Sequence, residues 1–378
     1  TASLPHCLTA SLPHCLTASL PHCLTHSLTH SLTHSLTYTG LEAAALRPTP
    51  TPRWSKPVAG PATTISRSLW GLGALAVGAA AWGALVERGN YRLRVEQVPI
   101  LDPGSEPIRV LHLSDLHLAP WQKNAISWIR ALGDNPPDLI VGTGDFLGHK
   151  DALPALRQAL KPLEGIPGVV VHGSNDRVAP RAVNPFGYLF GPSEAKEVRE
   201  LLDFEGLVHL YTQELGWHDI NNGAVSLTIK GSELEFVGVG DAHHGEDEIS
   251  HLPEWLEAFR ESRSGTNAKS HRSVTSIGVT HAPYRRVLDA MVTNGSELIF
   301  AGHTHGGQVC VPGVGALTTN CDLPTRYARG LHVWRHANRA SYLNVSAGIG
   351  TNIYAPIRFA CPPEAVLVTL VGDDIGYA

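Results

Sequence analysis

Residues 108–118 read IRVLHLSDLHL, and this stretch decides the fold class that the sequence predicts. Its first six residues form a mostly apolar run, which is typical of a strand buried on both faces of a sheet. The run ends in a polar cluster that contains Asp115 and His117. A buried strand followed at once by a carboxylate and an imidazole indicates that the chemistry of this protein lies just beyond its strand ends.

Other apolar runs along the chain have the same strand character. They alternate with turn-rich or helical stretches, and residues 123–132 and 252–259 have the apolar spacing of helices. The further predicted strands are residues 138–143, 168–172, 234–239, 274–280, 297–302 and 365–371. The sequence therefore predicts a single α/β domain over residues 108–372.

Polar clusters also follow several of these later runs. Because residues two apart in extended backbone point the same way, Asp115 with His117, and His303 with His305, can each direct two side chains at one point. Carboxylates mixed with imidazoles suit Mn, Fe or Zn better than Ca. The further polar residues at strand ends are Asp145, Ser174, Asn175, Asp176 and His281. A single histidine at a strand end is more often a hydrogen-bonded structural residue, so the inference depends on the whole set.

In this order and with these glycines, the clusters resemble the calcineurin-like metallophosphoesterases. The family blocks are D-x-H, G-D, G-N-H-[DE], a single His and G-H-x-H, and the resemblance covers about residues 108–370. It implies a four-layer α/β/β/α sandwich with two divalent metal ions (Mn, Fe or Zn) at one edge. Such an enzyme hydrolyses a phosphate ester or phosphoanhydride with metal-activated water.

The resemblance also assigns residues to the two ions. Asp115, His117 and His305 would hold one ion. His281 and His303, together with a residue of the third block, would hold the other. Asp145 would bridge both ions, and Asp241 and His243 are expected to border the substrate.

The third block reads GSND at residues 173–176, where the family usually has G-N-H-D. Without a gap, Ser174 replaces the ligand asparagine and Asn175 replaces the catalytic histidine. With a shift of one residue, Asn175 remains the ligand and the histidine is missing. Because serine is a poor metal ligand, we predict Asn175 as a ligand and, with Asp145, as a catalytic residue. The altered block leaves a degenerate, non-catalytic metal-binding module as the alternative function.

The N-terminal part of the chain differs from this domain. Residues 1–37 repeat TASLPHCL and then THSL, which we interpret as a low-complexity segment that is disordered or an artefact, and residues 38–67 as a Pro-rich linker. Residues 68–86 carry no charge, and a helix of that length is about 28 Å long. We predict a transmembrane anchor there and a stem over residues 87–107. A cleaved signal peptide, with Ala79 and Ala81 at its cleavage site, is the alternative.

The predicted anchor implies a location for the domain. Slightly more Lys and Arg residues precede residues 68–86 than closely follow them, which favours a single-pass protein of the cell membrane with its catalytic domain extracytoplasmic. The anchor and the C-terminal sequence look like the bacterial membrane-tethered branch labelled YkuE/YaeI-like. That resemblance suggests a lipid-linked diphosphate or a UDP-diacylglucosamine-type substrate, besides phosphorylated small molecules. The net charge of −5 gives no basic surface for nucleic acid.

Overall fold

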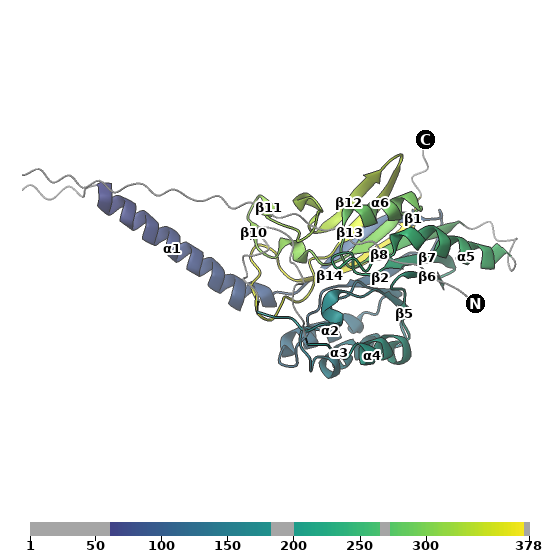
Figure 1. Ribbon diagram of the computed structural model, residues 1–378, viewed down its shortest axis with the longest axis horizontal. Coiled ribbons are helices and arrows are strands. Elements are labelled where there is room, and N and C mark those ends of the chain that lie inside the picture. The colour runs from purple at the N-terminus through teal and green to yellow at the C-terminus, as the bar shows by residue number, and fades with distance from the viewer. Residues whose placement is uncertain (1–60, 183–199, 265–272, 374–378) are drawn as a thin grey trace, which may run out of the picture. The chain divides into compact units, whose positions relative to one another are not determined.

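The computed structural model describes residues 61–182, 200–264 and 273–373 (Figure 1). The predicted repeat over residues 1–37 lies outside this range, as does the predicted linker up to residue 60. Helix α1 (Pro61–Leu85) covers most of the predicted anchor and begins before residue 68, because proline is tolerated in the first turn of a helix. Residues 61–67 are therefore helical and not an extended linker. Among the described residues, no helix has both the length and the hydropathy that crossing a membrane requires.

The first sheet has six strands in the order β1-β14-β2-β3-β4-β5. Strands β2, β3 and β4 run parallel, and the first three polar clusters follow them. Strand β14 is antiparallel to β2 and parallel to β1, so the sheet is mixed. The strands are β1 (Arg92–Leu101), β2 (Ile108–Leu113), β3 (Leu139–Gly142), β4 (Gly168–Val170), β5 (His218–Asp219) and β14 (Glu364–Gly372).

Strand β1 lies within residues 87–107, which we predicted as a stem. It pairs with β14 from Arg92, opposite Glu364, to Leu101, opposite Gly372, and Val98 is fully buried. The sheet therefore begins near residue 92 and not at residue 108. As an edge strand with several exposed positions, β1 carries charged residues among its apolar ones, so it lacks the continuous apolar run of the central strands.

The second sheet also has six strands, in the order β12-β13-β9-β8-β7-β6. Strands β7, β8 and β9 run parallel, and the last two polar clusters follow β8 and β9. A short hairpin of β10 (Cys310–Val311) and β11 (Gly315–Ala316) comes after the final cluster. The strands are β6 (Gly223–Ile229), β7 (Ser232–Val239), β8 (Val274–Thr280), β9 (Leu298–Ala301), β12 (Gly330–His336) and β13 (Arg339–Val345).

The two sheets pack against each other through buried side chains such as Val110 and Val141 from the first and Phe236 and Phe300 from the second. Helices cover the outer face of each sheet, three on the first and two on the second (Figure 1). They are α2 (Lys123–Ala131), α3 (Leu153–Leu160) and α4 (Phe204–His209), and then α5 (Leu252–Ser264) and α6 (Arg285–Thr293). The predicted α/β architecture is confirmed, with two mixed sheets.

Every strand predicted from an apolar run is present. Strands β2 and β8 have the predicted bounds, and the others differ by one or two residues at an end. The central strands are buried along nearly their whole length, as their sequences indicate. Helix α2 ends at Ala131, whereas α5 continues past the predicted residue 259 to Ser264.

Candidate metal centre

The ends of four strands bring the predicted ligands together. Asp115 and His117 follow β2, Asp145 follows β3, His281 follows β8, and His303 with His305 follows β9. Strands β2 and β3 belong to one sheet, and β8 and β9 belong to the other. The cluster therefore lies where the two sheets meet at one edge. Asp115, His117, Asp145 and His281 are each at most 3% exposed, which shields their interactions from water.

The backbone at these ligands is not extended. Asp115, His117, Asp145, His303 and His305 all have positive φ, between 39° and 66°. The prediction that each D-x-H or H-x-H pair converges through strand geometry is therefore wrong. The chain leaves each strand before the ligands, and left-handed backbone turns them toward one another. Such backbone costs energy for residues with side chains, and functional sites are where folds tolerate that cost.

Asp115, His117 and His305 form the first group that could hold a metal ion, with one donor atom from each lying within 4.8 Å of the others. The Nε2 atoms of His117 and His305 are 3.2 Å apart, and Nε2 of His305 is 3.4 Å from Oδ1 of Asp115. These are the residues that the family resemblance assigned to one ion.

Asp115, Asp145 and His281 form a second group within the same limit. Oδ2 of Asp145 lies 3.6 Å from Nε2 of His281 and 3.5 Å from Nε2 of His117. Asp145 therefore lies between imidazoles of both groups, which is the position that a bridging carboxylate requires. Asp115 is also shared, and sequence reasoning did not anticipate that.

His303 lies beside the second group without belonging to it. Its ring centre is 5.2 Å from that of His281, while its Nε2 is 3.3 Å from the carbonyl oxygen of Asn320. Its backbone N–H donates to the carboxylate of Asp115. The structure thus brings His303 to the cluster but turns Nε2 toward Asn320, 17 residues later in the chain, a contact that no sequence motif indicated.

The third block lies directly against Asp145. The side-chain amide of Asn175 donates to Oδ2 of Asp145 at 2.7 Å, and its backbone N–H donates to Oδ1 at 2.8 Å. Asp176 is fully buried and accepts hydrogen bonds from the backbone N–H groups of Asp145 and Phe146. The GSND loop therefore belongs to the site, and Asp176, to which sequence reasoning gave no role, fastens this loop to the loop after β3.

Asp241 and His243 border the cluster on the side of His303. The ring centres of His243 and His303 are 4.6 Å apart, and Nδ1 of His243 lies 3.0 Å from the hydroxyl of Tyr284. Asp241 is buried and accepts a hydrogen bond from the backbone N–H of His243. Their role in binding a substrate stays a prediction.

Burial and nearby charges set the protonation of the cluster. Burial alone would lower the pKa of His281, but the carboxylates of Asp145, Asp241 and Asp115 outweigh it and raise the pKa to about 9. Burial, reinforced by His117, lowers the pKa of His305 well below its ordinary value, so its imidazole is neutral and able to bind a metal. Three buried carboxylates lie beside imidazole nitrogens, and this mixed oxygen and nitrogen donor set fits divalent cations.

Arg358 is a buried supporting residue that sequence reasoning missed. Its guanidinium donates to the carbonyl oxygens of Ala347 at 2.7 Å and Gly350 at 2.6 Å, and lies 3.4 Å from Nδ1 of His305. It therefore ties the loop after β13 to a candidate ligand. An isolated arginine in the C-terminal sequence gave no signal of this role.

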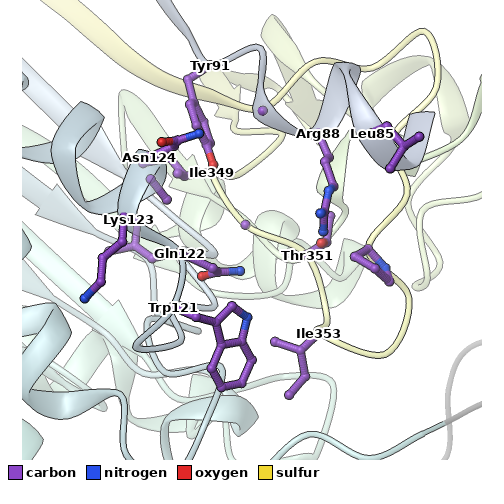
Figure 2. Close-up of a pocket in the computed structure, with 15 residues that line it drawn as sticks. Leu85, Arg88, Tyr91, Trp121, Gln122, Lys123, Asn124, Ile349, Thr351 and Ile353 are labelled. Carbon is purple, nitrogen blue, oxygen red and sulfur yellow. The ribbon is translucent and has the colours of Figure 1, made fainter. Parts of the chain in front are cut away.

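A cavity of about 340 Å³ lies next to the loop that carries Asp115 and His117 (Figure 2). None of the candidate ligands lines it, but Leu116, between two of them, does. In Figure 2, the side chain of Arg88 extends toward Thr351, and Gln122 points toward the same loop from the segment of Trp121 and Lys123. The cavity is lined by apolar side chains such as Leu85 and Ile353 and by polar ones that include the cations Arg88 and Lys123.

Comparison with known proteins identifies the family. The profile described as calcineurin-like phosphoesterase matches residues 108–307, more than half of the chain. The chain therefore belongs to the calcineurin-like phosphoesterase family, and it is a metallophosphoesterase.

Several curated proteins are similar over most of their length. The chain is 26% identical over 290 residues to Phosphodiesterase YaeI of Escherichia coli, covering 75% of this chain and 90% of that protein. It is 23% identical over 322 residues to the uncharacterized metallophosphoesterase YkuE of Bacillus subtilis, covering 79% and 94%. Among solved structures, TT1561 of Thermus thermophilus matches with a TM-score of 0.35 and 13% identity, covering 65% of this chain and 91% of that chain.

Proposed function

We propose that this protein is a two-metal phosphoesterase that hydrolyses a phosphate ester or phosphoanhydride. The observation that carries the proposal is the pair of overlapping Asp/His groups with Asp145 between them. Two bound divalent ions (Mn, Fe or Zn) would supply positive charge to the phosphoryl group and activate water as the nucleophile. No side chain of the cluster is then needed as a covalent nucleophile.

The protein's own residues hold and orient this site. Nδ1–H of His281 donates to the carbonyl oxygen of Thr143 at 2.6 Å, so its Nε2 faces Asp145. The backbone and side-chain amides of Asn175 fix both oxygens of Asp145. Asn175 can donate a hydrogen bond to a phosphate or a departing oxygen, but it cannot deliver a proton.

Hydrolysis of bis(p-nitrophenyl) phosphate by the chelator-stripped full-length protein tests this function. We expect no turnover without metal, and turnover that saturates as about two equivalents of Mn²⁺ are added. The competing function is a binding module of the same fold. A protein that binds two equivalents of Mn²⁺ and hydrolyses no phosphate substrate above the uncatalysed rate would be that module.

We further propose that the natural substrate carries a lipid and that α1 holds the protein at a membrane, with the domain on the extracytoplasmic side. Exposed apolar side chains on α1, among them Trp70, Leu75 and Val77, support this proposal. The cavity adds a second argument, because Arg88 suits a phosphate while Leu85 and Ile353 suit a lipid chain. A lipid-linked diphosphate has both features.

Membrane attachment is tested by fractionating cells that express the full-length chain. We expect the protein in the membrane pellet, released by detergent, and a reporter fused after Ala378 active only outside the cytoplasm. Replacing Leu75 and Val77 together by glutamate should move most of the protein to the soluble fraction, because each charge is costly in lipid. Val333→Glu, at an exposed valine of β12, is the matched control. Wild-type protein in the soluble fraction would contradict the proposal.

The variant Arg88→Gln tests whether the cavity binds the lipid-linked substrate. Loss of a charge-assisted hydrogen bond should raise the KM for a lipid-linked diphosphate about 10-fold or more and leave hydrolysis of bis(p-nitrophenyl) phosphate unchanged. Lys123→Gln is the control, because Lys123 also lines the cavity but points away from Arg88 in Figure 2. Equal effects of Arg88→Gln on both substrates would exclude a role in binding the lipid-linked one.

A further inference from the structure

Asp115 lies at the end of a chain of buried hydrogen bonds that starts in the opposite sheet. Asn344, on β13, contacts Nδ1 of His112, on β2, at 2.9 Å. Nε2 of His112 is 2.9 Å from the hydroxyl of Thr143, which is 2.6 Å from the hydroxyl of Ser114. Ser114 in turn donates to Oδ2 of Asp115. The side chains of all five residues have no exposed surface, so water is excluded from this series of hydrogen bonds.

The hydrogen bonds of this series all run in one direction, from Asn344 toward Asp115. The amide nitrogen of Asn344 can only donate, so Nδ1 of His112 accepts and the neutral ring carries its proton on Nε2. Burial, with a contribution from Arg94, lowers the pKa of His112 to about 3 and keeps the ring neutral. Nε2–H can then donate to Thr143, which leaves the Thr143 hydroxyl free to donate to Ser114.

The result is a fixed orientation of Asp115. Its Oδ2 accepts from the Ser114 hydroxyl and from the backbone N–H of His303 at 3.0 Å. The same N–H lies 3.2 Å from Oδ1, which faces Nε2 of His305 at 3.4 Å, so the Ser114 hydroxyl is what distinguishes the two oxygens. Gly302 makes room for this arrangement. A Cβ at residue 302 would overlap the Ser114 hydroxyl and lie 2.6 Å from Oδ2 of Asp115.

We propose that His112 is a positioning residue for the metal centre: through Thr143 and Ser114 it fixes which oxygen of Asp115 faces the ions. The inference rests on the proposed two-metal function, and none of the three residues is itself a predicted ligand. Groups that orient metal ligands typically change metal affinity 10–100-fold when they are removed. Loss of these hydrogen bonds should therefore lower the affinity for metal first, and lower turnover only as a consequence.

Thr143→Val tests the chain with little change of shape. In the full-length, metal-free protein we expect Mn²⁺ affinity, measured by titration calorimetry, to fall about 10–100-fold. Thr143→Ser keeps the hydroxyl and should restore affinity. Thr275→Val is the matched control, because Thr275, on β8, is also a buried threonine but donates to the carbonyl oxygen of Ile100, away from the cluster. Unchanged affinity in Thr143→Val would overturn the proposal.

His112→Phe separates positioning from general packing. If His112 acts through Thr143, the double variant His112→Phe/Thr143→Val should bind Mn²⁺ no more weakly than the weaker single variant. Additive losses would show that the two residues act independently and would overturn the proposal.

A readout without metal keeps this inference separate from the proposed function. Nitrogen NMR of labelled histidine in the metal-free wild type should show His112 neutral, with its proton on Nε2. A proton on Nδ1 would overturn the chain's direction whatever the metal experiments give. Wild type that binds Mn²⁺ but does not hydrolyse phosphate esters would instead count against the proposed enzymatic function alone.

Discussion

Asp145→Asn is expected to remove most bound metal and to lower kcat on bis(p-nitrophenyl) phosphate about 10³-fold or more. Oδ2 of Asp145 lies 3.5 Å from His117 and 3.6 Å from His281, which belong to different groups. Loss of its charge therefore weakens both positions at once. Metal analysis of the purified variant should give well under one equivalent, compared with about two in the wild type.

Two further variants sharpen this result. His305→Ala removes a side chain of the first group only, so about one equivalent of metal should remain. Glu235→Gln removes a buried carboxylate that pairs with Arg260 elsewhere in the second sheet, and should leave metal content unchanged. Circular dichroism would show whether each protein is folded. Equal metal content in Asp145→Asn and wild type would refute the linking role of Asp145.

The second large effect concerns the missing histidine of the third block. We expect log kcat for a series of aryl phosphate esters to fall steeply as the pKa of the leaving group rises, because Asn175 cannot supply a proton. General acid catalysis is worth about 10²–10⁴-fold, and the deficit should be largest for alkyl esters. Good leaving groups, including phosphoanhydrides, should be hydrolysed best.

Restoring the family block provides the matched comparison. Ser174→Asn combined with Asn175→His gives G-N-H-D, and should make the dependence shallower by speeding the esters with poor leaving groups. Ser174→Asn alone is the control for the changed loop. A shallow dependence already in the wild type would show that another group supplies the proton. His243, beside His303, could do so, whereas His172 hydrogen bonds to Asp219 and packs on Phe204.

The strands that were predicted and those that were missed differ in burial. Central strands such as β2 and β8 are buried along nearly their whole length, so a continuous apolar run identified them. Strands β1, β6 and β12 lie at sheet edges. Polar or exposed positions interrupt their apolar residues, so their sequences resemble loops. The stem assignment over residues 87–107 failed for this reason.

The candidate site divides in a similar way. Asp115, His117, Asp145, His281, His303 and His305 could all be predicted from the chain, because each directly follows a recognisable strand or lies in a block that resembles a family motif. The partners that orient them could not be found, because Arg358, Asn320 and Asn344 belong to no motif. Loop contacts bring Arg358 to His305 and Asn320 to His303, and the packing of the two sheets brings Asn344 to His112.

By itself, the sequence determined the α/β class, the central strands and the carboxylates and imidazoles of the candidate metal centre, because burial and ligand type are local properties of the chain. The tertiary structure decided how those residues meet. It replaced the expected extended pairs with left-handed turns, placed Asp145 and Asp115 between the two groups, and turned His303 toward Asn320. These outcomes depend on where the edge of one sheet lies against the other, and no single stretch of sequence specifies that distance.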